Sequence, residues 1–135
     1  MANVVPDSFK TDLLKGTFNF DSSGGSTFKL ALYTNISGLT TSTTAFTATN
    51  EVSTSGTNYT SGGNSLTNNG VAVSSNIAFV DFADLTFSSV TLSAVGALIY
   101  KSSSGNEAVL VLDFGGTKTA TNGDFVVQFP TANSS

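Results

Sequence analysis

The sequence predicts an all-β fold, a β-sandwich or a jelly-roll-like barrel, preceded by a short N-terminal helix or arm. Three observations carry this prediction: several short stretches alternate between apolar and polar residues, clusters of Gly, Asn and Ser separate them, and no helical period lies between them. Strands at such spacing are typical of sandwiches and barrels. A chain of 135 residues is expected to form one domain. We predict an arm or helix over residues 1–16, a β domain over residues 17–130 and a tail over residues 131–135.

Residues 6–16, PDSFKTDLLKG, indicate a short helix. Ser8 is suited to an N-cap, and Gly16 stands where a helix commonly ends. The apolar residues at positions i, i+4 and i+5 are Phe9, Leu13 and Leu14. Such an element either caps an open end of the core or is an arm that docks on a neighbouring molecule.

Alternation with a period of two predicts the strands. In residues 27–34, TFKLALYT, one face carries Phe28, Leu30 and Leu32. In residues 90–100, VTLSAVGALIY, the alternation runs from Val90 through Gly96 to Tyr100. The second half of this stretch is apolar on both faces, which predicts a central strand. Further strands are predicted over residues 17–20, 71–74, 77–82, 108–114 and 125–129.

Residues 35–69 form a long stretch rich in Ser, Thr, Asn and Gly. Loops of this length are uncommon inside compact domains and are usually functional or flexible. An edge strand over residues 43–49 would divide this stretch into shorter loops. Tyr59 is expected to act as an aromatic anchor before a turn.

The segment Asp-Phe-Gly-Gly-Thr-Lys at residues 113–118 is similar to the phosphate loop of actin-like sugar kinases, and it contains the Asp-Phe-Gly of protein kinases. Neither nucleotide site is expected, because the segment lies close to the C-terminus and no kinase catalytic loop precedes it. We predict instead that Gly115 and Gly116 end a strand. Residues 117–124 would then be a loop, with Asn122-Gly123 as a tight turn into the last strand.

Composition excludes several classes of function. Only 10% of the residues are charged, the net charge is -4, and all five cations are Lys. An acidic chain without Arg lacks the basic stripe that nucleic-acid binding requires. Without Cys there is neither a disulfide nor a thiolate metal ligand. We expect no signal peptide, because the N-terminus has no sufficient apolar run, and no membrane span.

Catalysis is not expected either. The chain has neither His nor Cys, which removes Ser-His, Cys-His and His-metal arrangements. The remaining acid–base candidates are Glu51, Asp81, Asp84, Asp113 and Asp124. A carboxylate pair could serve a glycosidase or bind calcium, but strand and turn positions favour structural roles. We therefore predict no catalytic, cofactor-binding or metal-binding residue, and we expect core positions for Phe79, Phe82, Phe87, Phe125 and Phe129.

Five stretches that span nearly the whole chain carry a resemblance to a known family: SFKTDLLKGTFNF, STFKLALYTN, TATNEVSTSGTNYTSGG, IAFVDFADLTFSSVTLSAVGALIYK and AVLVLDFGGTKTATNGDFVVQFP. Their most characteristic pieces are residues 50–52, 81–84, 96–100 and 112–115. They resemble a family of small proteins encoded among the virion structural genes of tailed bacteriophages. One departure is Val95, where the family pattern would have Arg.

The resemblance implies a non-enzymatic virion component, and a capsid decoration or cement protein suits this sequence best. Such proteins bind the outside of the assembled head, often as trimers, so the expected partners are the major capsid protein and further copies of this chain. The expected interface lies in residues 2–16 and at an edge of the sandwich, with residues 35–69 packed between copies. The residues predicted to contact partners are Val4, Val5, Phe9, Leu13, Leu14 and Tyr59.

Two other functions remain open. The protein could be a tail or head-tail component, or a fibre-associated domain that binds a host glycan. It could also be a glycan-hydrolysing or calcium-dependent enzyme that uses Asp81 and Asp84. The number of copies in a particle separates the first of these from a decoration protein. Loss of activity on Asp81→Asn would identify the second.

Overall fold

The fold is built on two long strands, β5 (Leu85–Lys101) and β6 (Ala108–Val127), which pair antiparallel in a computed structural model that describes residues 3–129. β1 (Phe28–Tyr33) pairs with β5, and the short β2 (Asn64–Ser65) pairs with β1. The larger sheet therefore has the order β2-β1-β5-β6. β5 is an interior strand, as its doubly apolar sequence predicts.

β3 (Asn68–Ser74) and β4 (Ile77–Phe82) form a second, two-stranded antiparallel sheet. Ser75 and Asn76 connect them, both with positive φ, as a two-residue hairpin turn requires. Within the described residues one helix, α1 (Asp7–Leu14), precedes the strands. The predicted all-β fold with a short N-terminal helix is confirmed.

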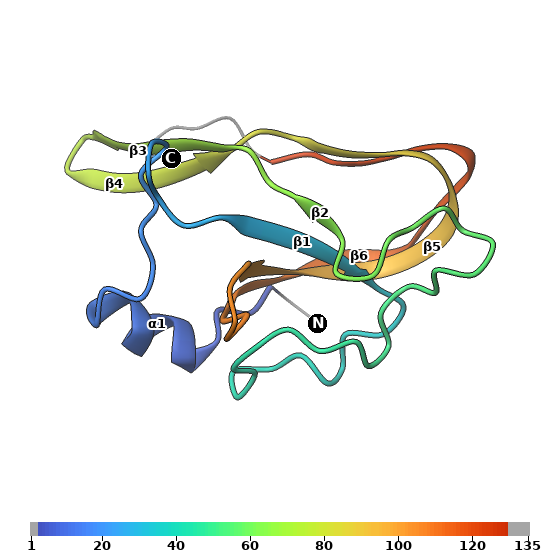
Figure 1. Ribbon diagram of the computed structural model, residues 1–135, viewed down its shortest axis with the longest axis horizontal. Coiled ribbons are helices and arrows are strands. Elements are labelled where there is room, and N and C mark those ends of the chain that lie inside the picture. The colour runs from blue at the N-terminus through green and yellow to red at the C-terminus, as the bar shows by residue number, and fades with distance from the viewer. Residues whose placement is uncertain (1–2, 130–135) are drawn as a thin grey trace.

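The β5–β6 pair folds over itself, so that its two halves lie in opposite layers (Figure 1). The pairing shifts register between Phe87 and Val90, between Val90 and Leu92, and between Ala94 and Gly96. Bulges of this kind bend a strand pair and increase its twist. One apolar cluster fills the space between the layers, where Phe87 and Phe125 share a core with Leu30 and Ile99. The arrangement is sandwich-like.

The bulge at Gly96 also switches which residues of β5 face the core. Ala94 and Ala97 belong to the central cluster, whereas Leu98 belongs to a second cluster on the other face of the sheet. The predicted unbroken alternation from Val90 to Tyr100 is therefore wrong. A Cβ at Gly96 would lie 2.5 Å from the carbonyl oxygen of Leu112, so the close approach of β5 to β6 at this bulge needs glycine.

Residues 34–52 cover the outer face of the larger sheet. Ile36 and Leu39 are buried there beside Tyr33 and Leu98, and the ring of Phe46 stacks 4.8 Å from that of Tyr100. The edge strand predicted over residues 43–49 is absent from this part of the described chain, which forms one isolated bridge, Ala45 to Glu107. Its polar side chains instead satisfy the backbone locally, as in the bond from the Thr40 N–H to the Thr43 hydroxyl (2.8 Å).

Three other strand predictions need correction. Residues 17–20 form no strand, although Phe18 and Phe20 pack against the core from an irregular segment. Gly115 and Gly116 do not end a strand, and residues 117–124 are not a loop, because β6 continues to Val127 and Lys118 pairs with Ala94. Positive φ at these glycines is accommodated as an irregularity within β6.

Asn122-Gly123 is likewise part of β6 and not a turn between strands, with Gly123 paired to Val90. The strand predicted over residues 125–129 is the end of β6, which stops at Val127. The predicted strands at residues 28–33, 71–74, 77–82 and 108–114 are present. The tail predicted over residues 131–135 lies outside the described residues.

Candidate functional site

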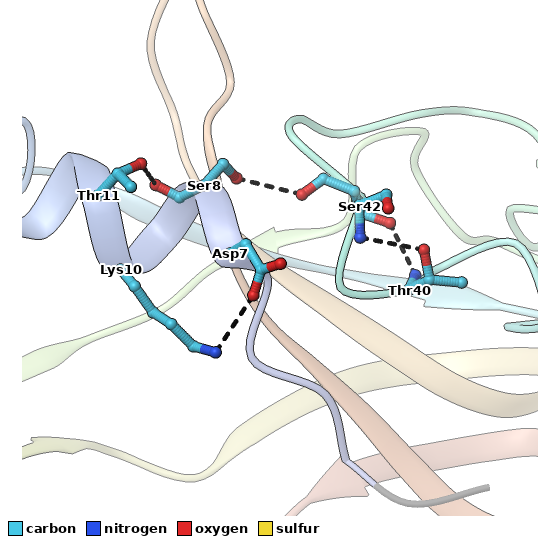
Figure 2. Close-up of polar contacts among 7 residues, drawn as sticks. Asp7, Ser8, Lys10, Thr11, Thr40 and Ser42 are labelled. Atoms are coloured by element: carbon cyan, nitrogen blue, oxygen red, sulfur yellow. Dashed lines mark hydrogen bonds and ion pairs between the residues drawn. The ribbon is translucent and has the colours of Figure 1, made fainter.

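The helix α1 is tied to the loop over residues 40–43 by hydrogen bonds (Figure 2). The Asp7 N–H donates to the Thr41 carbonyl (2.9 Å), and the Ser8 hydroxyl donates to the Thr43 carbonyl (3.1 Å). Pro6 occupies the N-cap position, so the prediction of Ser8 as N-cap is wrong. The Ser8 side chain serves a tertiary contact instead, and proline suits a helix start because it lacks an N–H.

Ring contacts of Phe9 and a backbone bridge of Val4 also hold the N-terminal segment on the domain. The Phe9 ring lies 5.0 Å from that of Phe18 and 6.1 Å from that of Phe20. Val4 forms a bridge with Val111, in which each residue donates its N–H to the other's carbonyl (3.0 and 2.8 Å). The N-terminal segment therefore packs on its own domain, which agrees with the cap and not with a free arm.

The predicted interface residues divide into three groups. Leu14 is 90% exposed and Leu13 44%, and Val5 is also exposed. Val4 and Phe9 are partly buried by the contacts above. Tyr59 is 3% exposed, so the free chain does not offer its ring to a partner, contrary to the predicted interface role. Its ring lies in the core, 5.8 Å from that of Phe87, and there it is an anchor, as expected from the sequence.

Tyr59 and Glu51, both in the long loop of residues 35–69, form the centre of a polar network. The Tyr59 hydroxyl donates to the Glu51 carboxylate (2.7 Å) and accepts the Leu32 N–H (3.0 Å). The same carboxylate accepts the Gly62 N–H (2.6 Å) and the Ser61 hydroxyl (3.0 Å). These bonds join residues 51–62 to β1. The donors to the Glu51 carboxylate all lie in this segment, and the Tyr59 hydroxyl accepts the Leu32 N–H of β1.

The three tyrosines of the chain are all held in their neutral form. Burial raises the pKa of Tyr59 well above its usual value, and the hydrogen bond to Glu51 raises it further. Burial, followed by the charge of Glu51, also raises the pKa values of Tyr33 and Tyr100. A phenol with a raised pKa is a poorer acid and nucleophile, so this cluster holds the loop in place and does not resemble a catalytic site.

The four other carboxylates that the sequence offers as acid–base candidates accept hydrogen bonds from nearby donors, Asp124 from the Ser89 N–H (3.3 Å). Asp81 accepts the Asn69 amide (2.8 Å), and Asp84 accepts the Phe129 N–H (2.8 Å). Asp113 accepts the Gly115 N–H (2.9 Å), a bond that lowers the pKa of Asp113. Within residues 3–129 no three His, Cys, Asp or Glu side chains gather as a metal site would require. Asp113-Phe-Gly-Gly is thus a bulge with a capping carboxylate.

The sequence prediction missed one surface, the β3–β4 hairpin. Four of its apolar side chains are exposed: Val71, Val73, Ile77 and Val80. Phe79, predicted to face the core, is only half-buried. The available signal is that residues 71–80 contain no charge at all. Alternation does not reveal this surface, because apolar strand residues ordinarily belong to the core.

Comparison with known proteins adds no relative: the chain matches no family model, no curated protein and no solved structure. Among the described residues, the one helix, α1, is too short to cross a membrane.

Proposed function

We propose that this protein is a non-enzymatic structural component of a tailed-phage virion, and more specifically a decoration or cement protein that binds the exterior of the head. One observation carries the proposal: Leu13 and Leu14 are exposed on a helix that hydrogen bonds and the Phe9 contacts hold firmly on the domain. The resemblance to virion proteins supports it. The carboxylates of the five acid–base candidates also support it, since each accepts a hydrogen bond from a nearby donor.

A helix held in this way needs little ordering when it binds. Burying an exposed leucine side chain stabilises a contact by about 1.5–3 kcal/mol, before the cost of association is subtracted. Two leucines and Val5 therefore give a weak contact for each copy. Many copies on one shell would stabilise it together, because a patch of bound copies links several capsid subunits.

We expect purified particles to contain this chain in a ratio to the major capsid protein near one, or near one per capsid hexamer. The reason is that a decoration protein occupies every equivalent site of a symmetric shell. Quantitative gel densitometry of particles measures the ratio. A ratio below about one in twenty would contradict decoration and would favour the tail, head-tail or fibre alternative, whose symmetric assemblies have few subunits.

Replacing both leucines, Leu13→Ser and Leu14→Ser, is expected to lower binding to undecorated heads by about tenfold or more, since each buried leucine contributes about 1.5–3 kcal/mol. Stability should change less than binding, because Leu14 is 90% exposed and Leu13 44%. Co-sedimentation with heads at several concentrations measures binding, and thermal unfolding measures stability.

Lys15→Ser is the matched control, since it makes the same change at the next residue without removing apolar surface. Unchanged binding of the double-leucine variant would contradict a role of α1. Deleting residues 2–16 is a poorer test, because it also removes Phe9 from Phe18 and Val4 from Val111. Such a deletion confuses lost binding with a damaged core.

A further inference from the structure

The hairpin of β3 and β4 has an apolar face that the described chain leaves open. Val71 pairs with Val80, and Val73 pairs with Ala78. Because directly paired residues of antiparallel strands share a face, these four form one surface, called here the valine face. Val71 is 57% exposed, Val73 70% and Val80 37%. Figure 1 shows the hairpin projecting past the larger sheet.

The charge distribution indicates what can cover this face. Two copies of a chain with a net charge of -4 repel one another. Their repulsion is least where they meet through an uncharged surface, and residues 71–80 carry no charge. Proteins commonly protect exposed edge strands with Lys, Pro or inward charges, and residues 71–80 contain no Lys, Pro or charged residue. Residues 130–135 read PTANSS and contain no large apolar side chain.

We propose that the valine face is a contact between two copies of this chain. The same patch on each copy meets the other about a two-fold axis, with the faces packed as in a sheet-on-sheet contact about 10 Å apart. The residues that carry it are Val71, Val73 and Val80, with Ala78 leaving room for the opposing valines. Burial of the valines removes apolar surface from water, which favours association.

The size of the face sets the strength of the contact. Four residues in each of two strands cover about 130 Å² of sheet plane, from roughly 3.3 Å per residue and 4.8 Å between strands. A stable interface buries about 800 Å² on each partner. Association of the free protein is therefore weak and visible only at about millimolar concentration. If the protein decorates a shell, as proposed above, bound copies would meet at high local concentration.

Sedimentation of the purified full chain over a concentration range up to about 1 mM tests this proposal without any phage particle. We expect the average mass to rise with concentration. The rise should be larger at about 0.5 M salt than at about 0.05 M, because salt screens the repulsion between acidic copies. A monomer at every concentration and salt level would overturn the proposal.

Val73→Lys should weaken self-association by about tenfold or more, since it places a charge in the desolvated contact. Ser74→Lys is the matched control: it adds the same charge at the next residue, on the opposite face of the hairpin, and should leave association nearly unchanged. Val71→Thr with Val73→Thr tests the same face with side chains of similar shape and no added charge. Both valine variants should stay folded, because the side chains are exposed.

If Val73→Lys associates like the wild-type protein, another surface makes the contact and the proposal is wrong. If the wild-type protein and Val73→Lys are both monomeric, yet Val73→Lys loses binding to heads, then the valine face binds a capsid partner. That outcome also overturns the self-contact. The helix variants separate the two proposals. Leu13→Ser with Leu14→Ser should reduce head binding and leave self-association of the free chain intact.

Discussion

Raising the pH from about 9 to about 11.5 is expected to destabilise this protein by roughly 4 kcal/mol, a large part of the 5–15 kcal/mol typical of a domain. Tyr33 and Tyr59 have folded-state pKa values well above the usual value near 10. Below pH 10 their phenols are neutral in both states, so their stabilising contacts are fully present. Above it the unfolded chain loses protons that the folded chain retains, and each tyrosine costs about 1.4 kcal/mol per pH unit.

Urea unfolding at a series of pH values measures this loss. Absorbance titration of the phenolates is simple here, because the chain has three Tyr and no Trp. Tyr59→Phe is the control: it lowers stability at neutral pH through the lost bonds to Glu51 and Leu32. It should also reduce the slope above pH 10 by about 1.4 kcal/mol per unit. Stability that stays constant up to about pH 11.5 would contradict the buried neutral tyrosines.

Gly63→Ala is expected to destabilise the protein by about 3 kcal/mol or more. Gly63 has φ +78° and lies where the chain enters β2 beside β1. An added Cβ would overlap the carbonyl oxygen of Leu30 and approach the Ala31 Cα to 2.8 Å. Because both neighbours are backbone atoms of a buried strand, neither can move without disturbing the core. Thermal or urea unfolding measures the effect.

Gly56→Ala separates the steric effect from backbone strain. Gly56 has a similar φ of +73°, but a Cβ there would meet nothing within 4 Å. It should therefore cost only about 1 kcal/mol, the usual penalty for alanine in the left-handed region. Equal losses in the two variants would mean that β1 yields at Leu30 and that the contact is not tight.

Local pattern predicted the β1, β3, β4 and central β5 segments because each has its apolar residues at a regular period. It failed where two segments meet. Gly115 and Gly116 are typical strand-ending residues. They nevertheless lie within β6, because β6 pairs with β5 on both sides of this bulge, at Asp113 and at Lys118. Phe18 and Phe20 alternate like a strand and pack like one, but no neighbouring strand pairs with them in the described chain.

The candidate site was predictable in part. Leu13 and Leu14 stand out as apolar residues at the end of a short helix, and the structure leaves them exposed. Tyr59 looked equally available, but its exposure depends on the path of a loop of more than thirty residues. That path is set by contacts of high sequence separation, such as the bond from the Leu32 N–H to its hydroxyl. The valine face was missed because exposure cannot be read from alternation.

The sequence alone determined that this chain is an all-β protein with a short helix at its start, since these properties follow from residue periodicity and turn chemistry within a few positions. Composition also removed His-, Cys- and Arg-dependent chemistry. Only the tertiary structure decided that β5 and β6 fold over into two layers, that the long loop covers a sheet, and that one hairpin keeps its valines in solvent. Each of these depends on which distant surfaces meet, and burial is a property of that meeting and not of the residue.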